Sequence, residues 1–289
     1  MSNTTQFVAA MVGAGLRPPA EIYADNLLHR FGDCGKSSWY VLHLDGVPAG
    51  SFGDWRTGHT ETWCAKRNDD MNDSERQATW EHIKAARRQR DAEKARLQAE
   101  AASQAAAIWT AAAPAIEHDY LTRKAIEPHG LRTDGHRLLV PMRDTTGKLH
   151  SLQTISPEGE KRFLPSGRVK GCYFAIGKPA GSVTMCEGLA TGATIHATTG
   201  GAVAVCFSAG NLLSVAFALR IKYADLSITV AADDDWQTPG NPGISAARAA
   251  ASAVGGKLAV PNFDGLVRGI KDTDWNDMAR LIREKEAAS

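Results

Sequence analysis

The chain has 289 residues, of which 43% are hydrophobic and 22% are charged, and these proportions are typical of an ordinary globular protein. Its formal net charge of +1 excludes a protein that binds nucleic acid through overall basicity, so any such binding must come from local basic patches. Five scattered cysteines without a CxxC pair exclude the common zinc-ribbon spacings and a disulfide framework, which favours a reducing, cytoplasmic location.

Residues 1–71 predict an N-terminal α+β region. The alternating segment 38–44, followed by the turn Asp45-Gly46, indicates a small sheet built from hairpins. The apolar run 7–16 is too short to cross a membrane and lacks the charge layout of a signal peptide. We therefore expect a small domain and no membrane partner.

Residues 72–114 predict one long connecting helix. It starts at a cap-like segment, 72–74, and no Gly or Pro interrupts it before Pro114, where we expect it to end. At about 1.5 Å per residue it could be roughly 60 Å long. Its middle is basic and lacks an apolar stripe, which favours a solvated connector with i,i+4 charge pairs; the alternative is a contact with a phosphate backbone.

Residues 115–176 predict a basic, β-rich subdomain. A strand at 137–142, a turn at 144–148 and a return strand at 149–155 form a hairpin, and a further strand candidate follows at 161–164. Basic residues outnumber acids here, so this stretch is the best candidate for a nucleic-acid or triphosphate surface, although a merely basic sheet face remains the alternative. The candidate nucleotide- or DNA-binding residues are Lys124, Arg137, Lys161, Arg162 and Lys170.

Residues 177–289 alternate between strands and helices, which predicts an α/β fold with a parallel sheet and helices on both faces. Carboxylates follow two of the apolar strands: Glu187 after the first, and Asp233 and Asp235 after the third. Asp272 and Asp274 precede the last helix. Acids gathered at the carboxyl edge of such a sheet repel one another unless a cation lies between them, and an all-oxygen site favours Mg²⁺ or Mn²⁺ together with substrate phosphates.

The order of these acidic motifs resembles the Toprim fold of primases and topoisomerases. The motifs that carry the resemblance are Glu187-Gly188, Asp233-Asp234-Asp235 and the segment 271–277. Upstream, the segments 118–124, 138–141, 152–155 and 161–163 are similar to the region that precedes the Toprim domain in plasmid and phage primases. The segment 45–50, followed by Trp63, resembles the N-terminal part of the TraC-like plasmid primase group.

The resemblance implies a role for each acid. Glu187 would assist proton transfer or position metal, and Asp233 and Asp235 would hold divalent ions. Asp272 and Asp274, with Asp277 as a further member, would complete the metal pocket; the alternative for Asp274 and Asp277 is that they begin the last helix. Two ions roughly 3.5–4 Å apart would activate a 3′-hydroxyl and stabilise the leaving pyrophosphate.

The resemblance therefore implies a DNA primase, a nucleotidyltransferase that makes short RNA primers during the replication of a mobile element such as a phage or plasmid. Its partners would be single-stranded DNA, ribonucleoside triphosphates and a replicative helicase acting in trans. The chain departs from bacterial DnaG-type primases because it has no Cys/His set for a zinc module, so template recognition would lie in residues 1–70 or in a partner. The alternatives are a Toprim-type nuclease and a non-catalytic nucleic-acid-binding module.

Overall fold

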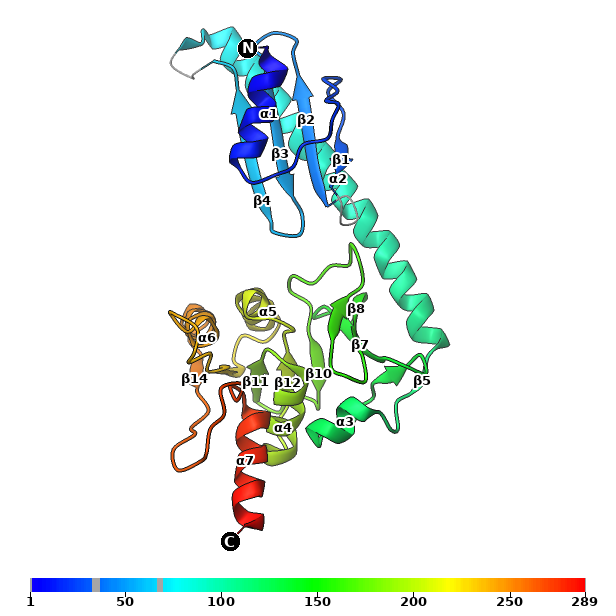
Figure 1. Cartoon of the computed structure of the whole chain (residues 1–289), viewed down its shortest axis with the longest axis vertical. Helices are drawn as coiled ribbons and strands as arrows, with labels where there is room; N and C mark the ends of the chain where they lie inside the picture. Colours follow the sequence, from blue (N-terminus) through cyan, green and yellow to red (C-terminus); the bar gives the residue numbers. More distant parts are fainter. Residues whose placement is uncertain (1, 33–36, 67–69, 289) are drawn as a thin grey trace. The chain divides into compact units, whose positions relative to one another are not determined.

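The structure is a computed structural model that describes residues 2–32, 37–66 and 70–288. Cys34 lies outside the described residues. The chain forms two compact units, residues 1–97 and 98–289, and the boundary between them falls inside helix α2 (Figure 1). The four regions expected from the sequence stay a prediction. Among the described helices, none combines the length and the apolar character that a membrane crossing requires.

The first unit contains an antiparallel sheet in which four strands follow one another in chain order. The strands are β1 (His29–Phe31), β2 (Ser38–His43), β3 (Ala49–Asp54) and β4 (His59–Cys64). The hairpin expected around Asp45-Gly46 is confirmed, because it joins β2 to β3. Helix α1 (Asn3–Gly13) was not predicted as a helix; Phe7 and Met11, from the apolar run 7–16, are the residues it buries against this sheet.

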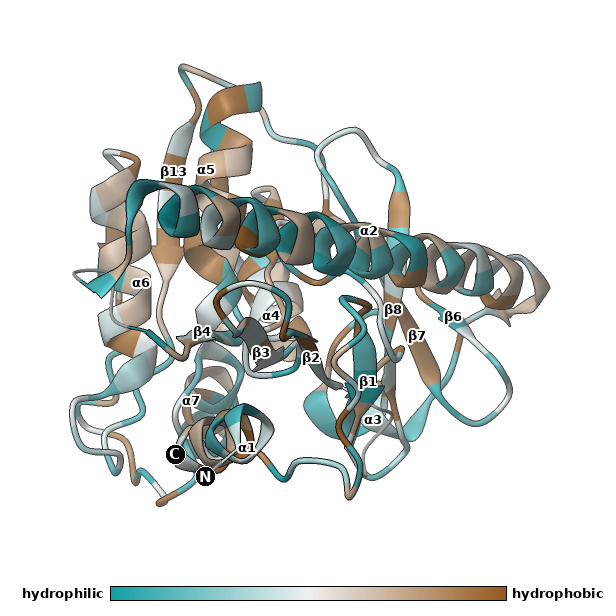
Figure 2. Ribbon diagram, turned by 90° about the horizontal axis from the view of Figure 1, so that it is seen from above, coloured by the Kyte–Doolittle hydropathy of each residue, from teal (hydrophilic) through white to brown (hydrophobic). Residues whose placement is uncertain are grey.

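Helix α2 (Asp73–Ala111) confirms the long helix of the sequence analysis. It begins at a capping box in which the Glu75 N–H donates to Asn72 Oδ1 at 2.9 Å and the Asn72 N–H donates to Glu75 Oε2 at 3.1 Å. The helix ends three residues before Pro114, which lies in the short strand β5 (Ala113–Pro114) instead. Much of its length is hydrophilic (Figure 2) and carries charge pairs such as Arg96–Glu93. The solvated connector and the contact with a phosphate backbone both stay predictions.

The second unit starts with an antiparallel sheet that runs in the order β5-β6-β7-β8-β9. The strands after β5 are β6 (Arg132–Thr133), β7 (Leu138–Arg143), β8 (Leu149–Ile155) and β9 (Lys161–Phe163). The predicted hairpin is confirmed as β7 and β8. A short helix, α3 (Asp119–Lys124), lies between β5 and β6 and was not predicted, because six residues are too few to display a helical period.

The C-terminal sheet has the order β10-β12-β11-β13-β14, and all of its strands are parallel except β10. Its strands are β10 (Phe174–Ile176), β11 (Ser182–Cys186), β12 (Val203–Val205), β13 (Ser227–Ala231) and β14 (Lys257–Ala259). This confirms the predicted parallel sheet. Strand β10 pairs with β12 although it precedes residue 177, so the sheet takes in residues ahead of the boundary expected from the sequence.

Helices cover both faces of the C-terminal sheet (Figure 1). They are α4 (Leu189–Thr199) and α7 (Trp275–Ala287) on one face and α5 (Ala209–Lys222) and α6 (Pro242–Ala253) on the other. Because both faces are covered, the strands bury apolar side chains on each side. Gly192 lets α4 approach β12 closely, since a Cβ there would stand 2.6 Å from the Val205 side chain.

Candidate active site

The acids expected at the carboxyl edge of the sheet come from neighbouring parallel strands. Strands β11 and β13 pair directly, with Met185 opposite Val230, so the residues that follow them emerge at the same edge. Glu187 follows β11, and Asp233 and Asp235 follow β13. Glu187, Asp274 and Asp235 each raise the pKa of Asp233 through charge repulsion, so these four carboxylates share one electrostatic environment.

Asp233 is the most perturbed of these acids. Burial of its carboxyl group, reinforced by the charges of Glu187, Asp274 and Asp235, raises its pKa to about 8. Its Oδ1 atom is buried and accepts no hydrogen bond from any residue that the structure describes. A buried carboxylate oxygen without a partner is costly, and a cation is one partner that would satisfy it.

Glu187 is also held in conditions that disfavour its charge. Burial raises the pKa of its carboxyl group, and the nearby Asp235 raises it further. The backbone N–H of Ala209, at the start of α5, and the ammonium of Lys161 act in the opposite direction. Glu187 and Asp233 therefore both hold protons more tightly than ordinary surface carboxylates do.

The segment that carries Asp235 is fastened to the start of α6. The Gly243 N–H donates to Asp235 Oδ2 at 3.0 Å, and the Asp235 N–H donates to Asn241 Oδ1 at 3.0 Å. Gly243 is required at this position, because a Cβ there would stand 2.4 Å from the carbonyl oxygen of Asp233. Asp234, between the two acids, is ion-paired with Arg268 at 2.8 Å.

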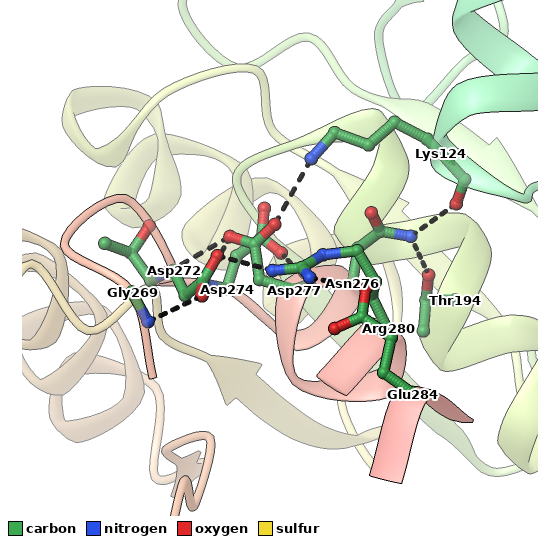
Figure 3. Close-up of polar contacts among 10 residues, drawn as sticks. Lys124, Thr194, Gly269, Asp272, Asp274, Asn276, Asp277, Arg280 and Glu284 are labelled. Atoms are coloured by element: carbon green, nitrogen blue, oxygen red, sulfur yellow. Dashed lines mark hydrogen bonds and ion pairs between the residues drawn. The ribbon is translucent and has the colours of Figure 1, made fainter. Parts of the chain in front are cut away.

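The acids of the third motif, Asp272, Asp274 and Asp277, have different partners (Figure 3). Asp274 is the N-cap of α7: its Oδ1 accepts the Asp277 N–H at 2.9 Å, and Asp277 completes a capping box. Asp277 also pairs with Lys124 at 3.3 Å. The oxygens of Asp272 are engaged by Arg280 at 2.8 Å and by the Gly269 N–H at 2.8 Å. The structure thus brings Asp274 to the other acids, whereas Asp272 is held by Arg280.

The acids do not converge on a single point. Within residues 2–32, 37–66 and 70–288, no group of three or more His, Cys, Asp or Glu side chains is close enough together to hold a metal ion. The donor set nevertheless fits a hard divalent cation, because its ligands would be carboxylate oxygens and Oδ1 of Asp233 has no hydrogen-bond partner among the described residues.

Two of the five predicted basic residues lie at this site. Lys161, on β9, interacts electrostatically with Asp274, Asp233 and Glu187, and its Nζ lies 3.9 Å from where a Cβ on Gly188 would stand. Although the residue as a whole is exposed, protein atoms around its ammonium displace water and lower its pKa, while the acids raise it. The other residue is Lys124, through its ion pair with the third acidic motif.

The other three predicted basic residues are exposed. Arg137 pairs with Asp134 at 2.7 Å and Arg162 pairs with Glu160 at 2.7 Å. Arg162 also points to the opposite face of β9 from Lys161, because successive side chains of a strand alternate. The roles of Arg137, Arg162 and Lys170 in binding nucleotide or DNA stay predictions.

Two residues that support the site were missed from the sequence. Asn276 is buried, and its Nδ2 donates to the carbonyl oxygen of Lys124 and to Thr194 Oγ1, both at 2.8 Å, which joins α7 to α3 and α4 (Figure 3). Arg268 donates hydrogen bonds to Asp234, in the segment after β13, and to the carbonyl oxygen of Asp272, in the segment before α7. The one sequence signal was the position of Asn276 inside the acidic motif, whereas Arg268 carried none.

Comparisons with known proteins give the site a family context. Residues 182–282 match the Toprim domain family. Over 242 residues the chain is 37% identical to a DNA primase TraC of Escherichia coli, and over 287 residues it is 34% identical to another DNA primase TraC of that organism. These alignments cover 79% and 91% of this chain, but 23% and 20% of the relatives, so the chain spans about a fifth of their length.

Among solved structures, the chain was matched to the primase fragment of the bacteriophage T7 primase-helicase protein. It superimposes with a TM-score of 0.45 at 14% sequence identity, and the match covers 62% of this chain and 76% of that fragment.

Proposed function

We propose that this chain, which carries a Toprim domain and is a relative of the TraC primases, synthesises short RNA primers on single-stranded DNA. The observation that carries the proposal is the buried Oδ1 of Asp233, which has no hydrogen-bond partner in the part of the chain that the structure describes and whose carboxyl group lies in the field of Glu187, Asp274 and Asp235. Such a cluster is costly to maintain, and perturbed carboxylates of this kind concentrate at functional sites. Phosphate chemistry with a divalent cation accounts for both the acids and the lysine beside them.

Asp233 and Asp235 would hold the cation, which we propose to be Mg²⁺ or Mn²⁺, together with substrate phosphates, because Mg²⁺ is usually bound through one or two carboxylates. When bound, such an ion lowers the pKa of an attacking hydroxyl group and stabilises charge on a leaving phosphate. Its binding would displace the proton that Asp233 retains near neutral pH, because the pKa of that carboxyl group is about 8. Asp272, held by Arg280, would support the site by fixing the segment before α7.

The chain's own groups have roles in primer extension. Glu187 is suited to accept the proton of the primer 3′-hydroxyl as its oxygen attacks the α-phosphorus of the next nucleotide and pyrophosphate departs, because burial raises the pKa of this carboxyl group. Lys161 supplies positive charge where the triphosphate would approach the acids. Lys124 is held in place by Asp277 and would add to the same field.

The exposed basic residues Arg137, Arg162 and Lys170 would contact the single-stranded template or the triphosphate, through phosphate contacts that depend on salt rather than on sequence. A replicative helicase acting in trans is the protein partner that we propose for a primase of this kind.

The test is a primer-synthesis assay with labelled ribonucleotides, single-stranded DNA and Mg²⁺ or Mn²⁺. We expect short labelled RNA from the unaltered chain and none from Asp233→Asn or Glu187→Gln. The control is Asp225→Asn, an exposed acid outside the site, which should retain full activity. Shortened DNA without incorporation of nucleotides would identify a nuclease. If the unaltered chain makes neither product, and template binding survives both substitutions, the chain is a binding module.

A further inference from the structure

An aromatic pair lies beside the acids and has no part in the chemistry described so far. Phe163, the last residue of β9, is 40% exposed, and its ring centroid is 6.3 Å from that of Phe207 with an interplanar angle of 81°. Phe207 lies between β12 and α5 and packs partly against the core. The more exposed ring, Phe163, therefore lies on the outermost strand of its sheet. Charged and polar residues are usual on such edge strands.

The backbone of Phe207 is held in an unfavourable conformation. Its φ of 72° lies in the left-handed region, which residues other than glycine rarely adopt. Its N–H donates to the carbonyl oxygen of Glu187 at 2.8 Å, so this strained residue is fastened directly to the acid at the end of β11. Strain of this kind clusters at functional sites, and here it occurs at a residue whose backbone is bonded to that of a candidate catalytic acid.

Strand geometry places the aromatic pair close to a positive charge. Lys161 and Phe163 are two residues apart on β9, so their side chains leave the strand on the same face about 7 Å apart. The Lys161 ammonium lies among Glu187, Asp233 and Asp274. A single nucleotide is long enough to place its phosphates beside Lys161 and its base on Phe163.

We propose that Phe163, with the Phe207 ring packed against it at nearly a right angle, forms a stacking platform for the base of the incoming ribonucleoside triphosphate, with Lys161 beside its phosphates. This inference rests on the proposed function. Stacking on an aromatic face suits a polymerase that must accept every base, because each base has a π-face and stacking is tolerant of sequence. The platform is also next to the acids that would bind the triphosphate with its cation.

The test compares a ligand that has a base with one that lacks it. Equilibrium binding of ATP and of inorganic tripolyphosphate, each with Mg²⁺, would be measured on the full chain and its variants. We expect Phe163→Ala to weaken ATP binding about 5- to 20-fold and to leave tripolyphosphate binding unchanged, because one stacking contact is lost. Phe163→Tyr keeps the ring and should restore ATP binding.

Two further variants keep the test sharp. Phe217→Ala removes a phenyl group that is 46% exposed on α5 in the same unit, so it is the matched control and should change neither affinity. Phe207→Gly relieves the positive φ while removing the second ring, and it should also weaken binding of ATP alone.

Different results would contradict the stacking platform and the proposed primer synthesis. Equal losses for ATP and tripolyphosphate, or no loss for either, would overturn the platform. An effect of Phe163→Ala on binding of oligo(dT) but not of ATP would overturn the assignment to the incoming nucleotide. Primer synthesis that is normal in Phe163→Ala at subsaturating nucleotide would refute the platform and leave the proposed function intact. A Phe163-dependent affinity for ATP in a chain that makes no primers would refute only the proposed function.

Discussion

Arg268 donates a hydrogen bond to Oδ2 of Asp234 at 2.8 Å, across 34 positions of the sequence. The same guanidinium donates to the carbonyl oxygens of Asp234 at 3.0 Å and of Asp272 at 2.8 Å, and it lies 3.9 Å from the centre of the Phe263 ring. The Asp234 N–H also donates to the carbonyl oxygen of Thr273 at 2.7 Å. Arg268 thus fastens the segment after β13 to the segment before α7, and both segments carry candidate site acids.

Replacing Arg268 should therefore loosen two acidic segments at once. We expect Arg268→Ala to lower the free energy of unfolding by about 2–4 kcal/mol, because Asp234, with a side chain only 16% exposed, would lose its ion-pair partner and keep only the hydrogen bond from Asn241 Nδ2 at 2.6 Å among the side-chain contacts of the described residues. Chemical denaturation would measure the loss. Arg283→Ala, an exposed arginine on α7, is the matched control and should change stability by less than about 0.5 kcal/mol. Equal effects of the two substitutions would contradict the role given to Arg268.

The buried acid at the end of β13 should make stability depend on pH. The pKa of Asp233 is about 8 in the folded chain against 3.8 ordinarily, so the folded state binds an extra proton between these values. Stability should therefore fall as pH rises from about 4 to about 8, and Asp233→Asn should remove this loss, a gain on the order of a few kcal/mol at pH 9. Thermal unfolding at pH 4 and pH 9 tests it; a variant that gains equally at both would contradict the assignment.

A divalent cation should offset the loss of stability that the ionised carboxyl group of Asp233 causes. Adding Mg²⁺ at pH 8 should raise the melting temperature of the unaltered chain and release protons, since the ion binds the folded state and competes with the proton on Asp233. At a concentration 100 times the dissociation constant, the gain would be about 2.7 kcal/mol. Asp233→Asn should show little of this gain, and a chelator should abolish it. Equal stabilisation of the variant by Mg²⁺ would show that the ion binds elsewhere.

The acids at strand ends could be predicted because local pattern fixes them. A buried parallel strand is a short apolar run, and the residue after it must emerge at the edge, which placed Glu187 and Asp233 from the sequence alone. The different roles of Asp272 and Asp274 could not be predicted in this way. Asp272 pairs with Arg280, and that pairing depends on how α7 is oriented relative to the segment before it. The bonds of Asn276 were equally hidden, since Lys124 is 152 positions away.

Helix limits show the same division between local and tertiary causes. The cap at Asn72 was predictable from the residue types that accept backbone N–H groups. The end of α2 at Ala111 was not, because the following residues pair with β6, and that pairing depends on a partner in another segment. Phe207 in the left-handed region also carried no signal, since glycine is the residue expected there.

Gly243 should be intolerant of a side chain. An added Cβ would stand 2.4 Å from the carbonyl oxygen of Asp233 and 2.9 Å from Asp235 Oδ2. We expect Gly243→Ala to displace the start of α6 from the acids, to cost about 1–3 kcal/mol of stability and to reduce primer synthesis. Gly210→Ala on α5 is the matched control: a Cβ there meets nothing within 4 Å, so it should be neutral or stabilising by up to about 1 kcal/mol.

Asn276 offers the sharpest test of how α7 is held against the rest of the second unit. Asn276→Ala removes the two hydrogen bonds to Lys124 and Thr194 and should cost about 1–3 kcal/mol of stability. Asn276→Asp has nearly the same shape but cannot donate to the Lys124 carbonyl oxygen and buries a charge against it, so it should cost more than the alanine. Urea denaturation of both variants, with Thr194→Val to complete a double-mutant cycle, would measure the difference. If the aspartate proved as stable as the asparagine, the hydrogen bond donated to the Lys124 carbonyl oxygen would contribute nothing measurable, and the link from α7 to α3 would have to be assigned to the Lys124–Asp277 ion pair instead.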